Sequence, residues 1–363
     1  MNLYNFQNPF ISHIKFRRLL NKADSFKKTY HIVLDISNSN ITYKPGDSLA
    51  IIPQNDPKIV ELTINAMKSD PDELIIDPKT KKSVRLFDFL LHKANLTKAT
   101  YNFFSLFTKI SINEAKNIIS SHHIWDLIKL FPNHDVKTQD MCDHLLPILP
   151  RLYSCASSLN MYPNEIHLII THVEYELSSI LRNGVTTEFM CNLAQLHKTP
   201  IPIYIQHSHG FSLTKDVEKP IIMIAAGCGI APFRAFMEER FLSNSIGKNW
   251  LFFGERKAAN DFYFESFFKD LEEKTILRIN TAFSRDQEDK IYVQDRLLEN
   301  GSDIWQWLCL GAIIYICGNI KMAREVDEKM QEIFIEEGNL TKEESAHFLR
   351  QLIKEKRYLK DVY

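Results

Sequence analysis

The sequence predicts an antiparallel β-barrel with a helical insertion, followed by a doubly wound, mainly parallel α/β sheet. Three observations support this: the first sixty residues alternate β-rich stretches with turns, Pro57 to Leu146 has helical character, and strands alternate with helices from Pro220 onward. A chain of 363 residues fits two compact domains and an insertion. We predict a barrel over 1–60 and 147–217, the insertion over 61–146 and the parallel-sheet domain over 218–363.

The barrel prediction depends on strand and turn signals on both sides of the helical stretch. Lys44-Pro45-Gly46-Asp47 is a strong turn signal before an apolar run, and Gly184 predicts a second turn, before a short helical segment that ends near Leu193. Strands are expected at 30–36, 49–52, 151–154 and 165–174.

In the C-terminal part the expected strands are 221–225, 250–253, 276–283 and 312–317. One helix is expected to begin at Pro232, and three further helices are expected at 262–271, 293–299 and 322–336. Doubly wound sheets of this kind bind nucleotides at the carboxyl ends of their strands.

Composition excludes several classes of protein. The charge is balanced, with 44 Lys+Arg against 45 Asp+Glu, so no global signature of nucleic-acid or anionic-membrane binding is present. Residues 1–10 lack the layout of a signal peptide. The apolar run 221–233 is far shorter than the roughly 20 residues that span a bilayer. Six cysteines without a CxxC pair argue against a disulfide framework or a metal site, so we expect a cytoplasmic protein with reduced thiols.

The strongest local signal is the strand, turn and helix over 221–233. Gly227 and Gly229, on either side of Cys228, let the backbone approach a phosphate closely, and Pro232 suits the first turn of a helix whose N-terminus faces an anion. The segment departs from GxGxxG because Pro232 stands in place of the last glycine. An ordinary strand-to-helix turn is the alternative.

A second cluster follows the strand over 276–283. Ser284, Arg285, Lys290 and Tyr292, with Gln294 next to them, supply the charge-assisted donors that an extra dianionic phosphate such as the 2′-phosphate of NADPH requires. A solvated charged turn is the alternative.

A third group lies in the second half of the barrel. Arg151 and Tyr153 share one face of a strand and Ser154 faces the other way, so they can contact different parts of one ligand. The amides after Gly184 can hold a pyrophosphate. The candidate cofactor-binding residues here are Arg151, Tyr153, Ser154, Thr171, Tyr175, Gly184, Val185, Thr186 and Thr187.

Two further features carry alternatives of their own. Cys317 ends a buried strand on the side where ligands bind, although a cysteine in that position is more often inert core. The chain ends on Tyr363 shortly after Asp361, and a terminal aromatic is usually part of a frayed tail.

Together these segments resemble the reductase half of diflavin reductases, in particular the flavoprotein component of sulfite reductase. The resemblance spans nearly the whole chain. It is carried by segments 8–10, 43–47, 54–57, 150–158, 229–237, 248–254, 284–287 and 357–363.

The resemblance implies an enzyme that binds FAD and NADPH and passes hydride from nicotinamide C4 to flavin N5. By position, Arg151 matches the contact to the FAD pyrophosphate, Tyr153 packs on the flavin and Ser154 bonds near N5, while 184–187 match the second FAD-phosphate segment. Ser284, Arg285, Lys290 and Tyr292 match the 2′-phosphate site; Ser154, Cys317, Asp361 and Tyr363 are the expected catalytic residues. In this family the terminal aromatic covers the flavin and moves for nicotinamide to stack.

Two departures from the family qualify these expectations. Cys228 stands where the family usually has Thr, which is expected to weaken pyrophosphate binding modestly. Nothing upstream of Asn8 matches the family's FMN domain, so either the sequence is part of a longer chain, or electrons leave FAD for a separate flavodoxin-like FMN protein or a haem-protein subunit. The rival predictions are a stand-alone ferredoxin or flavodoxin NADP reductase or a cytochrome-reductase-like enzyme, and a non-catalytic assembly subunit. Simple ferredoxin reductases lack the helical insertion.

Overall fold

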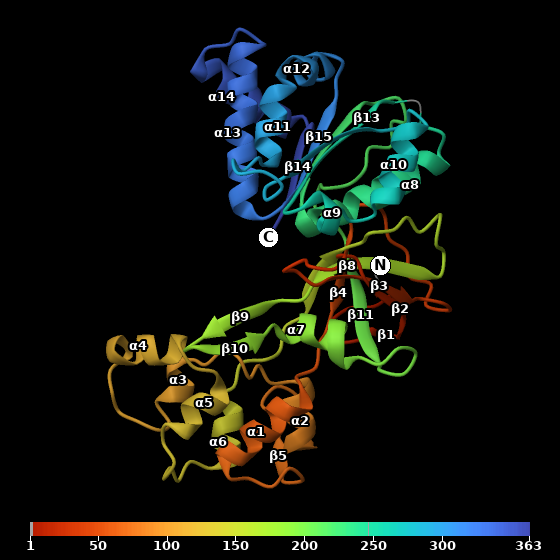
Figure 1. Cartoon of the computed structure of the whole chain (residues 1–363). Coiled ribbons are helices and arrows are strands. Elements are labelled where there is room, and N and C mark those ends of the chain that lie inside the picture. The colour runs from red at the N-terminus through yellow and green to blue at the C-terminus, as the bar shows by residue number, and fades with distance from the viewer. Residues whose placement is uncertain (1–2, 246) are drawn as a thin grey trace.

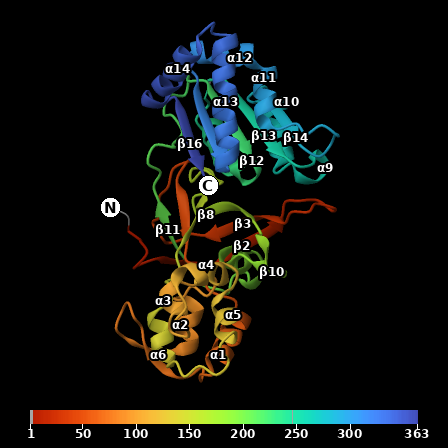
Figure 2. The ribbon, with the colours of Figure 1, turned by 90° about the vertical axis from the view of Figure 1, so that its left-hand side faces the viewer.

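A computed structural model describes residues 3–245 and 247–363 of the chain. Its elements form three regions stacked in one direction, with a β-barrel between a helical region and an α/β unit (Figure 1). A view turned by 90° shows the same order (Figure 2). In both views the C-terminus lies where the α/β unit meets the barrel, which places the end of the chain between these two regions.

The barrel is built from two antiparallel sheets, in the strand orders β1-β11-β4-β7 and β2-β3-β8. Alternate residues of β11 are buried, so Ile201, Ile203 and Ile205 face a core that both sheets share. The antiparallel barrel predicted from the sequence is confirmed. Its strands are β1 (Phe10–Ser12), β2 (Ile14–Leu19), β3 (Thr29–Asp35), β4 (Ser48–Ile51), β7 (Arg151–Ser154), β8 (Glu165–Thr171) and β11 (Ile201–Gln206).

The predicted turn at 44–47 is present and depends on its glycine. The Asp47 amide donates to the Lys44 carbonyl over 2.9 Å. Gly46 has a φ of 102°, and a Cβ there would lie 2.1 Å from the Phe211 carbonyl oxygen. Only glycine therefore fits.

The strand predicted over 165–174 is two strands, because the chain leaves β8 at Thr171 and enters a separate hairpin. That hairpin, β9 (Glu174–Leu177) and β10 (Ile180–Asn183), extends toward the helical region, where Arg182 pairs with Asp126 at 2.8 Å. The short helical segment expected after Gly184 is present as α7 (Val185–Glu188) and a π-helix, Phe189–Leu193.

The helical region has its own buried core, which includes Val60, Leu90, Phe103 and Trp125. A capping box of Ser111 and Glu114 begins one of its helices, as the sequence order Ser-x-x-Glu favours. The predicted helical character is confirmed, and a small hairpin, β5 (Leu74–Ile76) and β6 (Ser83–Arg85), is an addition. Its helices are α1 (Pro57–Met67), α2 (Leu86–His92), α3 (Tyr101–Phe104), α4 (Ile112–Ser120), α5 (Ile124–Lys129) and α6 (Thr138–Asp143).

The α/β unit contains one parallel sheet in the order β14-β13-β12-β15-β16, so the doubly wound prediction is confirmed. The sheet carries a separate hydrophobic core on each face, because its central strands are apolar on both sides. The strands are β12 (Ile221–Ala226), β13 (Asn249–Glu255), β14 (Arg278–Phe283), β15 (Ile313–Gly318) and β16 (Tyr358–Val362). The helices are α8 (Ala231–Leu242), α9 (Ala258–Asp261), α10 (Glu265–Glu273), α11 (Val293–Glu299), α12 (Gly301–Cys309), α13 (Ile320–Glu336) and α14 (Lys342–Lys354).

Four elements of this unit, α9, α12, α14 and β16, are absent from the sequence prediction. The last matters most, because β16 adds a parallel strand beside β15 and thereby orders the C-terminal residues. Among the described residues, no helix is long and apolar enough to cross a bilayer, and no group of three or more metal-ligating side chains is found.

Candidate functional site

The strand β12 occupies the point of the sheet where the chain changes direction. Its neighbours are β13 on one side and β15 on the other, the arrangement that opens a crevice at the carboxyl ends of the strands. A 3-10 helix, Gly227–Ile230, lies there before α8. A Cβ at Gly229 would lie 2.0 Å from the Cys317 carbonyl oxygen, so this turn packs directly on the end of β15. The close approach to a phosphate expected of Gly227 and Gly229 stays a prediction.

Three of the four residues expected to be catalytic meet at this edge. The Ser154 hydroxyl, at the end of barrel strand β7, donates to the Asp361 carboxylate over 2.9 Å. Cys317 lies opposite Asp361 in the β15–β16 register and is buried. Burial, with Asp361 nearby, holds the pKa of the Cys317 thiol well above its usual range, so this group is a neutral S–H rather than a thiolate.

The fourth, Tyr363, ends the chain beside the same group. Its amide donates to the Gly318 carbonyl over 3.1 Å, and its own carbonyl accepts from the Ile320 amide over 3.2 Å. The main chain is thus held on both sides, while the residue as a whole is 63% exposed. The tail is therefore an ordered segment, unlike the frayed end that was the alternative.

Three of the residues expected to bind flavin, Arg151, Tyr153 and Ser154, lie on the edge strand β7. Arg151 is exposed and Tyr153 is partly buried on one face of β7, while the Ser154 hydroxyl, on the other face, contacts Asp361. Gly184 is the N-cap of α7, and the first amides of a helix have no partner inside it. This donor set fits a dinucleotide with an aromatic ring system and a pyrophosphate.

Two members of that set have other contacts. Thr187 accepts from the Val173 amide and donates to the Gly184 carbonyl, each over 3.1 Å, so its hydroxyl shapes the turn. Thr171 lies 2.8 Å from the Cys228 sulfur and 2.9 Å from Thr29, which makes it part of the contact between barrel and α/β unit.

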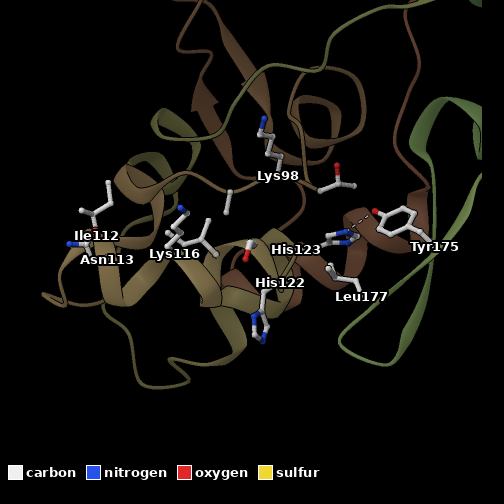
Figure 3. A pocket seen from close by; sticks show the side chains of 12 residues that line it. Lys98, Ile112, Asn113, Lys116, His122, His123, Tyr175 and Leu177 are labelled. Atoms are coloured by element: carbon white, nitrogen blue, oxygen red, sulfur yellow. Dashed lines mark hydrogen bonds between the residues drawn. The ribbon is translucent and has the colours of Figure 1, made fainter. Parts of the chain in front are cut away.

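Tyr175 lies farther along the hairpin, away from this edge. It lines a cavity of about 730 Å³ between the hairpin and the helical region, where His123 Nε2 is 2.9 Å from its hydroxyl (Figure 3). Burial lowers the pKa of His123 to about 4, so its ring is neutral. Lys98 and Lys116 supply positive charge to the same cavity.

The predicted 2′-phosphate cluster lies at the end of β14. The Arg285 amide donates to the Arg256 carbonyl over 2.8 Å, and the side chains of Arg285, Lys290 and Tyr292 are exposed. Gln294 differs from them, since it is buried and its amide donates to Glu325 over 2.8 Å.

Sequence reasoning missed two cations at this edge. Arg256 directly follows β13, and Lys27, from the loop between β2 and β3, forms an ion pair with the buried Glu255 at the end of β13. A Cβ at Gly227 would lie 3.6 Å from Glu255 and 4.0 Å from Lys27 Nζ, so the pair borders the glycine turn. For Arg256 a signal existed, because it follows a predicted parallel strand directly; for Lys27 we find none.

The fold and the site describe a flavoprotein oxidoreductase with separate flavin and nicotinamide regions, and family models agree. The "FAD binding domain" model matches residues 4–120 and 76–189, and the "Oxidoreductase NAD-binding domain" model matches residues 223–328. The chain belongs to the FAD binding domain family and carries an oxidoreductase NAD-binding domain after it. FAD and a nicotinamide nucleotide, as predicted, are the cofactors of these domains.

Among individual proteins, the chain is similar to the sulfite reductase (NADPH) flavoprotein alpha-components of several bacteria. It is 36% identical over 375 residues to that of Bacillus subtilis (strain 168), and 38% identical over 378 residues to that of Buchnera aphidicola subsp. Acyrthosiphon pisum (strain APS). The Escherichia coli O9:H4 (strain HS) protein is 32% identical over 374 residues. These alignments cover 99–100% of this chain and 62% of each relative, so the chain spans 62% of their length. The predicted resemblance is confirmed.

Proposed function

We propose that this chain is an NADPH-dependent FAD reductase that takes hydride from NADPH and passes electrons to a protein acceptor in sulfite reduction. The observation that carries the proposal is the meeting of Ser154, Cys317 and Asp361 beside the glycine turn of β12. Strand β7 of the barrel and strands β15 and β16 of the parallel sheet thus contribute side chains to the same site. The names of the similar bacterial proteins support NADPH as donor and sulfite reduction as the setting.

Bound FAD would supply the chemistry, by accepting a two-electron hydride and releasing electrons singly. The chain's own residues would bind the cofactor and orient it. Arg151 supplies counter-charge to the FAD pyrophosphate, with the amides after Gly184, and Tyr153 packs on the ring system. Ser154, held by Asp361, presents its hydroxyl to the flavin edge.

On the nucleotide side, the turn over 227–229 holds the pyrophosphate, and Ser284, Arg285, Lys290 and Tyr292 hold the 2′-phosphate. Cys317, as a neutral thiol, offers a compact apolar contact to the nicotinamide. Tyr363 covers the flavin until nicotinamide displaces it.

The acceptor is a flavodoxin-like FMN protein or a haem protein, as the similarity to sulfite reductase flavoproteins supports. Six free cysteines, four of them buried, support a reducing cytoplasm as its location.

The proposal is tested with purified chain loaded with FAD. Flavin released by denaturation is expected to be FAD, one per chain, without FMN, and NADPH is expected to drive reduction of ferricyanide. A chain that retains FAD and still fails to reduce ferricyanide with NADPH would be a binding subunit instead.

A further inference from the structure

Arg234 lies in the first turn of α8, directly after the glycine turn, and is buried in the contact between the α/β unit and the barrel. Its NH1 donates to the Ala156 carbonyl over 2.7 Å and to His167 Nδ1 over 3.0 Å. Its NH2 lies 2.7 Å from a carboxylate oxygen of Glu238, one turn farther along the helix. One guanidinium of the α/β unit thus reaches two barrel residues.

The contact to His167 fixes the state of that ring. Because a guanidinium only donates, His167 Nδ1 accepts, and Nε2 carries the proton, which it donates to Glu165 over 3.1 Å. Burial and Arg234 lower the pKa of His167 to about 4, in agreement with a neutral ring. Arg234 therefore has a defined acceptor, rather than a competing cation, on the barrel side.

Two carboxylates of α8, those of Glu238 and Glu239, accept hydrogen bonds from the barrel loop 156–160. The Ser158 amide donates to Glu238 over 2.8 Å, its hydroxyl donates to Glu239, and Asn160 Nδ2 donates to Glu239 over 2.7 Å. We call Arg234, Glu238 and Glu239, together with loop 156–160, the α8 clamp. Its contacts are directional hydrogen bonds, so it defines an orientation, which apolar packing alone does less strictly.

The clamp joins two segments that matter for the proposed reaction. Loop 156–160 follows directly on β7, which ends at Ser154, and α8 follows directly on the glycine turn that packs against Cys317. A shift of α8 on this loop would move the nucleotide turn relative to the flavin strand. Hydride transfer is sensitive to such shifts, because a displacement of about 1 Å can cost about 100-fold in rate.

Phe264 completes the enclosure of Arg234. The guanidinium lies 4.7 Å from the Phe264 ring centroid, and Phe264 has a φ of 56°, in the left-handed region that a bulky residue adopts only when its surroundings hold it there. The buried cation is thus enclosed by side chains and main-chain groups from both regions.

We propose that Arg234 is a positioning residue for hydride transfer, which sets the spacing between the nicotinamide and flavin sites by fixing α8 to loop 156–160. The inference rests on the proposed function, since it assumes that hydride passes between these two sites.

The same helix offers a matched control. Arg240 is also buried on α8, but its NH2 donates to the carbonyls of Lys219 and Gly247, each over 3.0 Å, and so stays within the α/β unit. Substitution of either arginine by methionine removes a buried cation from one helix. Only Arg234→Met removes a cation that joins the α/β unit to the barrel.

The first measurement is amide hydrogen exchange on the FAD-loaded chain. Arg234→Met is expected to raise exchange at residues 156–160 about 10-fold or more, whereas Arg240→Met raises it near 219 and 247 and leaves 156–160 within twofold of the parent. Equal exchange at 156–160 in both variants would overturn the proposal. This readout needs no turnover, so it separates failure of the clamp from failure of the proposed function.

The second measurement is the limiting rate of flavin reduction at saturating NADPH. Arg234→Met is expected to lower this rate at least 10-fold while FAD content and NADP⁺ affinity stay within twofold, and Arg240→Met is expected to keep the rate within twofold. A rate loss that follows only the loss in Tm of the two variants would mean that Arg234 is merely structural.

If Arg234→Met does not fold, Arg234→Lys takes its place. One ammonium cannot reach Ala156, His167 and Glu238 together, so the same two changes are expected with smaller size, about threefold. Unchanged exchange and rate in Arg234→Lys would overturn the proposal. If the parent's FAD is not reduced by NADPH at all, the proposed function fails, and exchange alone decides whether the clamp exists.

Discussion

The hydroxyl of Ser154 and the carboxylate of Asp361 meet over 2.9 Å, and this hydrogen bond joins the barrel strand β7 to β16, the last strand of the chain. Because the carboxylate accepts from Ser154, the hydroxyl has a fixed direction. The bond also draws β16, and with it Tyr363, toward the barrel. The first prediction tests what this bond does for the reaction.

Ser154→Ala is expected to lower the limiting rate of flavin reduction by NADPH about 10- to 100-fold, the range for loss of a charge-assisted hydrogen bond worth roughly 1.5–3 kcal/mol. Stopped-flow absorbance with matched FAD content is the measurement. Ser48→Ala is the control, because Ser48 lies opposite Ser154 in the β4–β7 register and makes no part of the proposed site. If the two variants react alike, the bond to Asp361 has no role in the reaction.

Choice of nucleotide is expected to depend on Arg285 and Lys290. Replacement of both by neutral residues should raise the KM for NADPH by at least about 10-fold per lost bond, each worth roughly 1.5–3 kcal/mol, and leave NADH nearly unchanged. Lys274→Gln controls for loss of a surface cation, because Lys274 directly follows α10 and pairs with Asp270. Equal losses with both nucleotides would show that the cluster does not bind the 2′-phosphate.

Tyr363 is expected to act as a gate. Stacking of its ring on the flavin is subtracted from the apparent nicotinamide affinity, and aromatic pairs contribute roughly 0.5–1.5 kcal/mol. Tyr363→Ala should therefore improve kcat/KM for NADH relative to NADPH about 2- to 10-fold, and should slow NADP⁺ release. The substitution keeps the main-chain bonds to Gly318 and Ile320, which deletion would remove. An unchanged NADH/NADPH ratio would mean that the ring does not cover the flavin.

Glu238 provides a pH test of the domain contact. Burial raises its pKa to about 7, even though Arg234 and the Ser158 amide lower it. A carboxyl whose folded pKa is raised contributes stability that is full below the usual pKa and is lost as pH rises through about 7.

Glu238→Gln removes this titration, so the free energy of unfolding of the variant minus that of the parent should rise between pH 5 and 7.5, by on the order of 3 kcal/mol. The interaction with Arg234 is already part of the Glu238 pKa, and the glutamine that replaces it does not titrate, so the slope of the difference with pH is the test. His31 and His167 titrate in the same window with the opposite sign, since burial lowers their pKa values, but they are present in both proteins. Chemical denaturation at several pH values gives the difference, and a flat difference would contradict the prediction.

Local sequence patterns predicted much of the fold, because hydrophobic periodicity and turn-forming residues are visible in the sequence itself. The helix over 293–299 was predicted with the bounds that α11 has. The strand β16 was missed, because five residues with two charges carry little strand signal, and pairing with the buried β15 is what orders them. The limits of the barrel, insertion and parallel-sheet domain stay a prediction.

The site was predictable residue by residue but its contacts were not. The residues singled out near the sheet edge follow strands or precede helices, which a sequence can reveal. Ser154 and Asp361 are 207 residues apart, and the barrel contacts of Arg234 lie 67 and 78 residues away, so no local pattern records them. The roles of the individual site residues stay predictions that the variants above test.

Hydride transfer within this one chain is the central claim, and a single-turnover measurement tests it most directly. The FAD-loaded protein is mixed, without oxygen, with NADPH or with NADPH that carries deuterium at the transferred C4 position. The absorbance of the oxidised flavin, at ~450 nm, is followed. Stoichiometric bleaching in one turnover is expected, and it should be slower with the deuterated nucleotide. Persistent oxidised flavin in the presence of saturating NADPH would contradict it.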